Sequence, residues 1–301
     1  MFIIKYKKIF VSISAILVLA SIISIFTFDL KFGVDFTGGS ITEVSFSGEL
    51  PAQNSVIEKV ESVGINQVSV RQAGDDGYII KTQVIDDATK NNLVESIGQL
   101  GEVPNVDRFN TVGPTLGNEL KSRALLALII LVTAIILFIA YTFRQVSKPV
   151  SSWKYGLVAI IALVHDILIT IGVFVVLGNL WGLEIDTLFV TALLVILGYS
   201  INDTIVVLDR VRENLKDLDD NVREQKFDKI VGQSLSETFT RSINTSLTTL
   251  LALLALYFVG GDSTKNFALA LVVGIIAGSY SSIFIAAPML IWFKNKKKQG
   301  K

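Results

Sequence analysis

The chain has 301 residues, of which 51% are hydrophobic and 18% are charged, and its mean hydropathy is +0.57. This is too apolar for an ordinary soluble domain, and the formal net charge of zero argues against nucleic acid or a strongly acidic substrate as a partner. The absence of cysteine and the single histidine, His165, exclude disulfides, thiol catalysis and Cys- or His-cluster metal sites, so we expect no cofactor and no metal.

The first predicted element is a membrane-spanning helix over residues 9–28. A bilayer core is about 30 Å thick and is crossed by roughly 20 mostly apolar residues. Three lysines precede this segment, as in a signal peptide, but the apolar run is too long and no small-x-small cleavage pattern precedes Asp29. We therefore expect residues 1–30 to form a retained first transmembrane helix.

Residues 31–123 predict a small α+β domain. Strands are expected at 41–46, 68–70, 78–84 and 105–112, and helices at 51–63 and from Asp86 or Asp87 to about residue 100. The order β-α-β-β-α-β is that of a ferredoxin-like unit. Since the segment has no His, no Cys and no nucleophile arrangement, we interpret it as a folded contact module and not as an enzyme.

Two glycine-containing stretches flank this domain, FGVDFTGGS at 32–40 and VGPTLG at 112–117. A Gly-Gly pair could hold a phosphate only if it led into a helix N-terminus, and Gly38-Gly39 leads into a predicted strand. Both stretches are predicted to be tight connectors between the domain and the membrane helices.

Five further spans are predicted at 124–143, 155–177, 187–208, 243–259 and 267–293, which gives a five-helix bundle over 124–293 and a basic tail over 294–301. The span at 243–259 is the shortest and carries several polar residues. The charged segment 209–237 before it is interpreted as an amphipathic connection at the membrane surface.

The distribution of lysine and arginine predicts the orientation. Basic residues gather before the first span, between the second and third spans, between the fourth and fifth spans, and at the C-terminus, whereas the turn 178–186 has none and the turn 260–266 has only Lys265. By the positive-inside rule, both termini are cytoplasmic and residues 31–123 are extracytoplasmic.

Ionisable residues inside the predicted spans are the candidate functional site. A charge at the bilayer centre costs roughly 2.5–3.5 kcal/mol even on the milder insertion scales, so such residues suggest function by default. His165 and Asp166 lie near the middle of the third span, and Asp203 lies beside Asn202 in the fourth. Tyr199 is one helical turn before Asp203 on the same face.

The candidate residues have alternative interpretations. Arg241, at the start of the fifth span, either extends toward lipid headgroups or reaches inward to pair with Asp203. His165 and Asp166 diverge by about 100° on a helix and need not face the same partner, so one of them could serve helix packing. Asp203 and Asn202 could likewise form a structural hydrogen-bond hub.

Proton coupling is the chemistry that these residues favour. Burial favours the protonated form of a carboxyl group, and a nearby arginine favours the ionised form. A conformational change that alters either effect makes the group bind or release a proton. An intramembrane aspartyl protease using Asp166 and Asp203 is the alternative from another class, but the Gly-x-Gly-Asp context of such enzymes is missing at both aspartates.

With these residues in view, the chain resembles the SecF family of protein-export membrane proteins, in the resistance-nodulation-division superfamily. The resemblance covers nearly the whole chain. It is carried by FGVDFTGGS, VGPTLG, LVHDILITIG at 163–172, LGYSINDTIVVLDRVREN at 197–214, RSINTSLTTLLALL at 241–254 and GIIAGSYSSIFIAAP at 274–288.

The resemblance implies a subunit of the Sec translocase, in the cytoplasmic (inner) membrane, that uses the proton-motive force to assist protein export. It implies SecD, the SecYEG channel, YajC, membrane lipid and the translocating preprotein as partners. The family's coupling aspartate matches Asp203 and its intramembrane arginine matches Arg241. A stand-alone proton-coupled exporter of lipids or small molecules is the alternative, although the small outside domain leaves little room for a binding funnel.

Overall fold

The computed structural model describes residues 2–65, 68–101, 103–142, 149–216 and 218–294. The chain divides into two compact units. The small unit comprises Phe32–Leu126 and Glu184–Thr187, and the membrane unit comprises Met1–Lys31, Ala127–Leu183 and Leu188–Lys301. The predicted basic tail lies outside the described residues except for Lys294.

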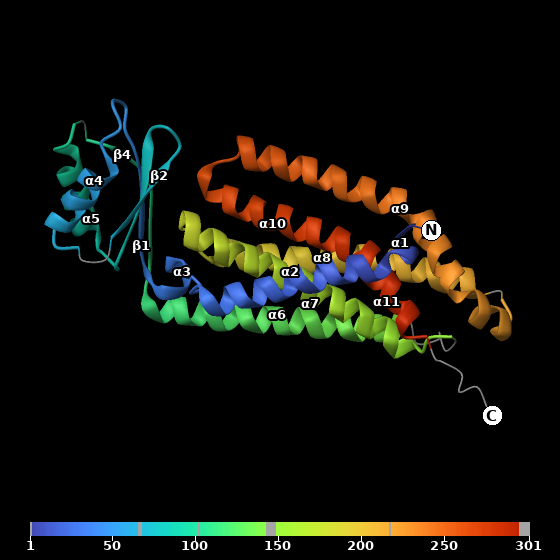
Figure 1. Cartoon of the computed structure of the whole chain (residues 1–301). Coiled ribbons are helices and arrows are strands. Elements are labelled where there is room, and N and C mark those ends of the chain that lie inside the picture. Colours follow the sequence, from blue (N-terminus) through green and yellow to red (C-terminus); the bar gives the residue numbers. More distant parts are fainter. Residues whose placement is uncertain (1, 66–67, 102, 143–148, 217, 295–301) are drawn as a thin grey trace. The chain divides into compact units, whose positions relative to one another are not determined.

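The small unit contains one four-stranded antiparallel sheet (Figure 1). Its strand order, β2-β3-β1-β4, is that of a split β-α-β arrangement, which confirms the ferredoxin-like prediction. Side chains from the sheet and two helices, including Val56, Ile80, Leu93 and Ile97, form its core. The elements are α3 (Val34–Thr37), β1 (Gly39–Ser45), α4 (Gln53–Ser62), β2 (Ser69–Ala73), β3 (Gly77–Thr82), α5 (Asp87–Gly98) and β4 (Asn105–Val112).

The two flanking stretches differ from the predicted connectors. The first contains the single helical turn α3 and then Gly38 and Gly39, whose positive φ angles of 77° and 146° favour glycine. Gly39 opens β1, so the pair does lead into a strand. The second stretch is not a separate connector, because helix α6 (Pro114–Thr142) begins at its proline, an imino acid suited to the first helical turn.

Helix α5 begins as the sequence predicts, with Asp86 as its N-cap. The carboxylate of Asp86 accepts a hydrogen bond from the Thr89 backbone N–H at 2.8 Å. Hydrogen bonding to Thr89 lowers the pKa of the Asp86 carboxyl from its ordinary value, because these bonds favour the ionised form.

The long helices of the membrane unit lie side by side (Figure 1). The described residues include six helices that are long and apolar enough to cross a membrane, as predicted. The helices besides α6 are α1 (Phe2–Lys5), α2 (Lys7–Thr27), α7 (Ser152–Trp181), α8 (Thr187–Lys216), α9 (Asp220–Val259), α10 (Asp262–Ser281), the π-helix η1 (Ser282–Ala286) and α11 (Ala287–Trp292).

The predicted surface connection 209–237 is helical over most of its length. Helix α8 continues to Lys216, and α9 begins at Asp220 and runs without a break into the predicted fifth span. One face of this first half of α9 is apolar, and its Phe227, Val231 and Leu235 are buried in the core of the membrane unit. The apolar face of this segment therefore packs against the other helices of the membrane unit.

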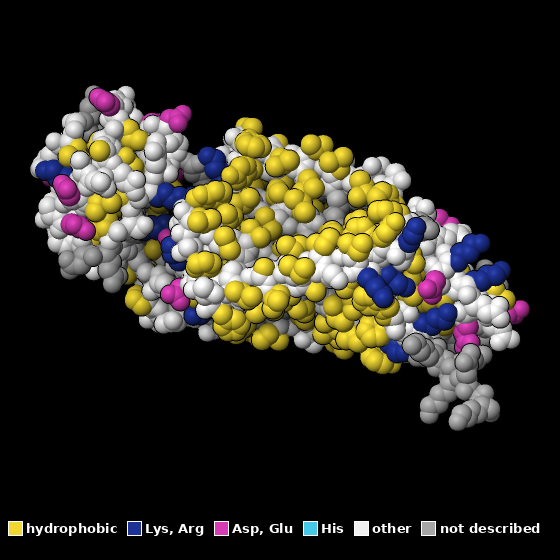
Figure 2. Space-filling view, in the orientation of Figure 1, with side chains coloured by type: hydrophobic (Ala, Val, Ile, Leu, Met, Phe, Trp, Pro, Cys, Tyr) yellow, Lys and Arg dark blue, Asp and Glu magenta, His cyan; other side chains and the backbone are white. Residues whose placement is uncertain are grey.

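The outer surface of the membrane unit matches a lipid environment. Figure 2 shows hydrophobic side chains covering the long helices, with lysine and arginine gathered beyond one end of this apolar band. Large apolar residues are exposed on α2, α6 and the second half of α9, for example Ile16, Leu137 and Phe258. In water this much exposed apolar surface would be unfavourable, whereas in a bilayer it is the expected outside.

Candidate functional site

Asp166, on α7, lies at the first of two buried carboxylate clusters in the membrane unit. Its side chain is fully buried. One carboxylate oxygen, Oδ2, accepts hydrogen bonds from Ser200 on α8 and from Ser281 at the end of α10, the latter at 2.9 Å. The other oxygen, Oδ1, lies 2.8 Å from Nδ1 of His165. The adjacent residues His165 and Asp166 thus contact one another.

Asp203, on α8, lies at the second cluster. Only 8% of its surface is exposed. Its Oδ1 accepts a hydrogen bond from Ser242 on α9 and its Oδ2 accepts one from Ser282 at the start of η1, each at 2.6 Å. Three helical elements therefore supply the carboxylate and its donors, and both donors are neutral hydroxyls.

His165 has an unusual environment. Its ring is stacked against Tyr280, with 6.4 Å between the ring centroids, and its Nε2 is buried with no hydrogen-bond partner among the described residues. A buried polar atom without a partner is costly, so it is a feature that calls for a functional explanation. The hydroxyl of Tyr280 donates to the Phe10 carbonyl of α2 at 2.8 Å, which fixes the ring that covers the histidine.

The remaining predicted residues lie on an exposed polar face. Asn202 and Arg241 are exposed, and Tyr199 is partly buried, with its hydroxyl 3.4 Å from Oγ1 of Thr249. Within the described residues no ion pair joins Arg241 to Asp203, whose oxygens are occupied by Ser242 and Ser282. In the structure, Asp203 and Asp166 each contact two serines, whereas Arg241 and Asn202 face outward.

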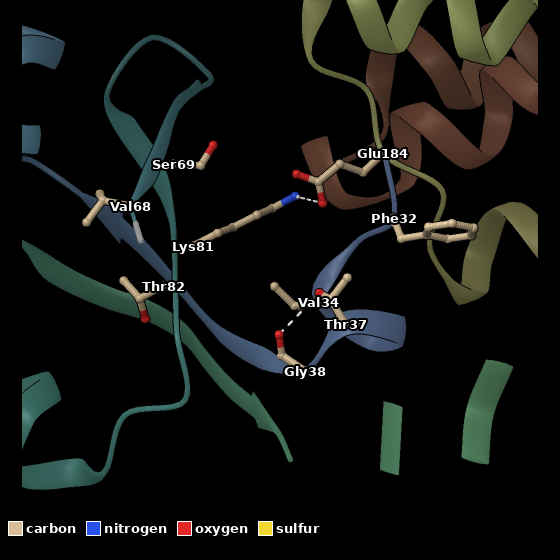
Figure 3. Close-up of a pocket in the computed structure, with 9 residues that line it drawn as sticks. All are labelled: Phe32, Val34, Thr37, Gly38, Val68, Ser69, Lys81, Thr82 and Glu184. Carbon is tan, nitrogen blue, oxygen red and sulfur yellow. Dashed lines mark hydrogen bonds and ion pairs between the residues drawn. The ribbon is translucent and has the colours of Figure 1, made fainter. Parts of the chain in front are cut away.

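The small unit has a different polar feature, at the segment Glu184–Thr187 (Figure 3). Glu184 forms an ion pair with Lys81 of β3 at 2.7 Å beside a cavity of about 280 Å³. The carboxylate of Asp35, in α3, accepts hydrogen bonds from the backbone N–H and the hydroxyl of Thr187 at 3.0 and 2.6 Å. These contacts attach the segment to the sheet and to α3.

Sequence reasoning missed the serine donors and this attachment. Serine is uncharged, so Ser200, Ser242, Ser281 and Ser282 do not stand out in apolar segments as Asp203 does. The polar run Ser279-Tyr280-Ser281-Ser282, with apolar residues on both sides, is the one signal that could have found two of them. For the attachment, the acidic Glu184 in a turn free of lysine and arginine was such a signal.

The fold and the site together define a class of protein: a polytopic α-helical membrane protein with a ferredoxin-like domain and buried carboxylates in its helical bundle. The sequence profile described as protein export membrane protein SecD/SecF, C-terminal, matches residues 92–296, and that of the SecD/SecF GG motif matches residues 23–49. The chain belongs to the SecD/SecF family of protein-export membrane proteins.

Individual relatives agree with this assignment. The chain is 36% identical to the protein translocase subunit SecF of Thermobaculum terrenum, over 98% of this chain and 94% of the relative. It is 37% identical to that of Anaerolinea thermophila, over 97% and 96%. The crystal structure of SecDF from Thermus thermophilus, a translocon-associated membrane protein, superposes with a TM-score of 0.81 at 29% identity and covers 96% of this chain. This chain spans 38% of the length of that SecDF chain.

Proposed function

We propose that this chain is an auxiliary subunit of the Sec protein translocase that couples protein export to the proton-motive force and catalyses no reaction of its own. The carrying observation is the burial of two carboxylates, Asp166 and Asp203, in an apolar bundle where hydroxyls and one imidazole are their hydrogen-bond partners. Family membership supports the role in export.

The surroundings of Asp203 suit a group that gains and loses a proton. A serine hydroxyl can donate to an ionised carboxylate or accept from a protonated carboxyl group, so Ser242 and Ser282 can satisfy both forms. A lysine or arginine partner would instead favour the ionised form. A proton that crosses 100 mV releases about 2.3 kcal/mol, which is enough to drive a conformational change of modest cost.

The exposed polar face of α8 and α9 supports SecD as the partner of this chain. Asn202, Asn244, Thr245 and Thr248 are exposed on α8 and α9, within segments otherwise suited to lipid. Polar side chains at membrane depth normally face other helices or a water-filled cavity. A second half of similar architecture would cover this face, and SecYEG, YajC, lipid and the preprotein would be further partners.

The positive-inside pattern supports the orientation. Lysines near the start of α2 and the basic residues at the end of α8 and in the first half of α9 would lie in the cytoplasm, with the small unit on the opposite side of the cytoplasmic membrane. The small unit would then be the part that meets exported polypeptide.

A substitution at Asp203 tests the coupling role. In cells that depend on this chain for export, we expect Asp203→Asn to leave the protein in the membrane but to abolish its support of export, because the amide cannot exchange a proton. Accumulation of precursor proteins is the readout. Asp209→Asn is the matched control, since it removes the same charge from an exposed carboxylate on the same helix that pairs with Arg212.

Normal export with Asp203→Asn would refute proton coupling at this residue. Loss of export with both variants would indicate a general effect of charge on α8 and would also count against the proposal.

A further inference from the structure

Two adjacent serines connect the two buried carboxylates. Ser281, the last residue of α10, donates to Oδ2 of Asp166, and Ser282, the first residue of η1, donates to Oδ2 of Asp203. Adjacent residues on a helix point about 100° apart, which lets one turn of backbone reach carboxylates on two neighbouring helices. Both serines are fully buried. The two clusters therefore share one structural element.

Each serine hydroxyl also has a second acceptor in its own helix. The Ser281 hydroxyl lies 3.1 Å from the Gly278 carbonyl, and the Ser282 hydroxyl lies 3.2 Å from the Ser279 carbonyl. A hydroxyl has one hydrogen and therefore donates fully to one acceptor at a time. When a carboxylate takes up a proton and becomes a donor, its serine can accept from it and turn its own hydrogen to the backbone carbonyl.

The helix changes its hydrogen-bond pattern at this point. Residues 282–286 form a π-helical turn, inserted between the α-helices α10 and α11. Such turns are rare and occur often at functional sites. Serine hydroxyls that bond to carbonyls of the preceding turn compete with the helical hydrogen bonds and bend helices. The choice of acceptor by Ser281 and Ser282 is thus linked to the local helical pattern.

We propose that Ser281 and Ser282 couple the protonation of Asp166 to that of Asp203, so that the two carboxyl groups titrate as one interacting pair through the π-helical turn η1. This inference rests on the proposed function, because it concerns the same buried carboxylates. Each step adds or removes one proton at a carboxylate oxygen, and the serine hydrogens only change acceptor. The serines are positioning residues.

Other titratable groups surround the pair. On the Asp166 side they are His165 of α7, in direct contact, and Tyr280 of α10, which stacks on that histidine. On the Asp203 side they are Tyr199 of α8, one turn away, and Arg241 of α9, which is exposed beside Ser242. Within the described residues none of these groups contacts both carboxylates, so the coupling is assigned to the adjacent serines Ser281 and Ser282.

The test is a pH titration of the two carboxyl groups. The full chain, purified with its partner and placed in lipid vesicles, is examined by infrared difference spectroscopy at the C=O stretch of protonated carboxyl groups. The bands are assigned with Asp166→Asn and Asp203→Asn. Two ionisable groups titrate as an interacting pair when their interaction is larger than about one pKa unit. We therefore expect each single aspartate variant to move the titration midpoint of the remaining carboxyl by about that much or more.

The serine variants identify the route of coupling. We expect Ser281→Ala or Ser282→Ala to reduce this mutual shift to less than half. Ser279→Ala is the matched control, because its hydroxyl bonds to Ser246 and touches neither carboxylate, and it should leave the shift unchanged.

Independent titration of the two aspartates in the serine-intact protein would overturn the inference, and this measurement needs no serine variant to fold. An undiminished shift in the serine variants would also overturn it. If the aspartates titrate independently while Asp203→Asn still abolishes export, the inference fails and the proposed function stands. If neither carboxyl titrates and Asp203→Asn exports normally, both fail.

Discussion

Asp203 is held by two hydroxyl donors, and this determines what the residue can do. A buried carboxylate that pairs with arginine would stay ionised, because breaking a buried ion pair costs about 3–5 kcal/mol. With Ser242 and Ser282 as partners, both protonation states keep their hydrogen bonds. The exposed Arg241 is then available to a group outside this chain.

This placement gives a prediction for Arg241. We expect Arg241→Met to abolish proton-linked export, because the positive charge is lost from the face beside the Asp203 cluster, and Arg241→Lys to retain part of it. Export in the presence and absence of a membrane potential is the measurement. Arg212→Met, which removes an exposed arginine paired with Asp209, serves as the control. Full activity of Arg241→Met would mean that the residue serves only as a headgroup contact.

A second residue-scale prediction concerns Asp86 and pH. The pKa of this carboxyl is lowered in the folded chain by hydrogen bonding to Thr89. The ionised cap therefore stabilises α5 fully at pH values above the unfolded-state pKa of about 3.9. This contribution is lost as the pH falls through the lower folded-state pKa. Hydrogen exchange of α5 amides should accelerate over that acidic range relative to α4. In Asp86→Asn, which keeps an acceptor but does not titrate, this difference should disappear.

The individual site residues differ in how far sequence could predict them. Asp166 and Asp203 are conspicuous because a carboxylate in an apolar span is expensive. The serines that donate to them are neutral and cost little to place in a membrane helix. Their role can therefore be recognised only when it is known which helices pack together. Whether Arg241 extends toward lipid headgroups or pairs with Asp203 could not be decided from the sequence for the same reason, since it depends on how α8 and α9 pack.

At the scale of elements, local patterns predicted most of the small unit. Alternating apolar residues and Gly-Asp turns place β1 to β4 within a few residues of their observed bounds, and the β-α-β-β-α-β order leads to the observed sheet. The length of α9 was not predictable from hydropathy. Its first half is charged on one face, and its burial of Phe227 and Leu235 depends on neighbouring helices that a single segment does not reveal.

The contact between α2 and α7 depends on a small residue. A Cβ atom added to Gly172 would clash with Ser21 of α2, including its backbone Cα at 2.7 Å. Because backbone cannot move aside as a flexible side chain can, we expect Gly172→Ala to lower the free energy of unfolding by about 1–3 kcal/mol. Unfolding in mild detergent, followed by the loss of helical circular dichroism, would measure it.

Gly156→Ala on the same helix is the control for this change. Its added Cβ would lie 3.6 Å from Ile139, an ordinary contact, and alanine favours helix over glycine. We expect that variant to be as stable as the parent chain or slightly more stable. Equal destabilisation by both changes would mean that α7 tolerates no side chain at either glycine, and that the α2 contact is not the cause.

At the scale of the whole molecule, the membrane unit has two kinds of outer surface. The exposed face of α6 is apolar, whereas the face formed by α8 and α9 carries exposed amides and hydroxyls next to Arg241. Gly198 lies on this second face, and an added Cβ there would meet nothing within 4 Å in the described chain. Because glycine lets helices approach closely, Gly198 offers a place where a helix from a partner could pack.

Cysteine labelling can test which face the partner covers, since the chain has no cysteine of its own. With the chain in mild detergent, we expect a Thr248→Cys variant to react with N-ethylmaleimide several-fold more slowly when purified together with SecD than when purified alone. Leu137→Cys, on the apolar face of α6, should react at the same rate in both preparations. Protection at residue 137 and not at 248 would place the partner on the wrong face for this proposal. In that case the exposed polar residues of α8 and α9 would have to line a water-filled path instead.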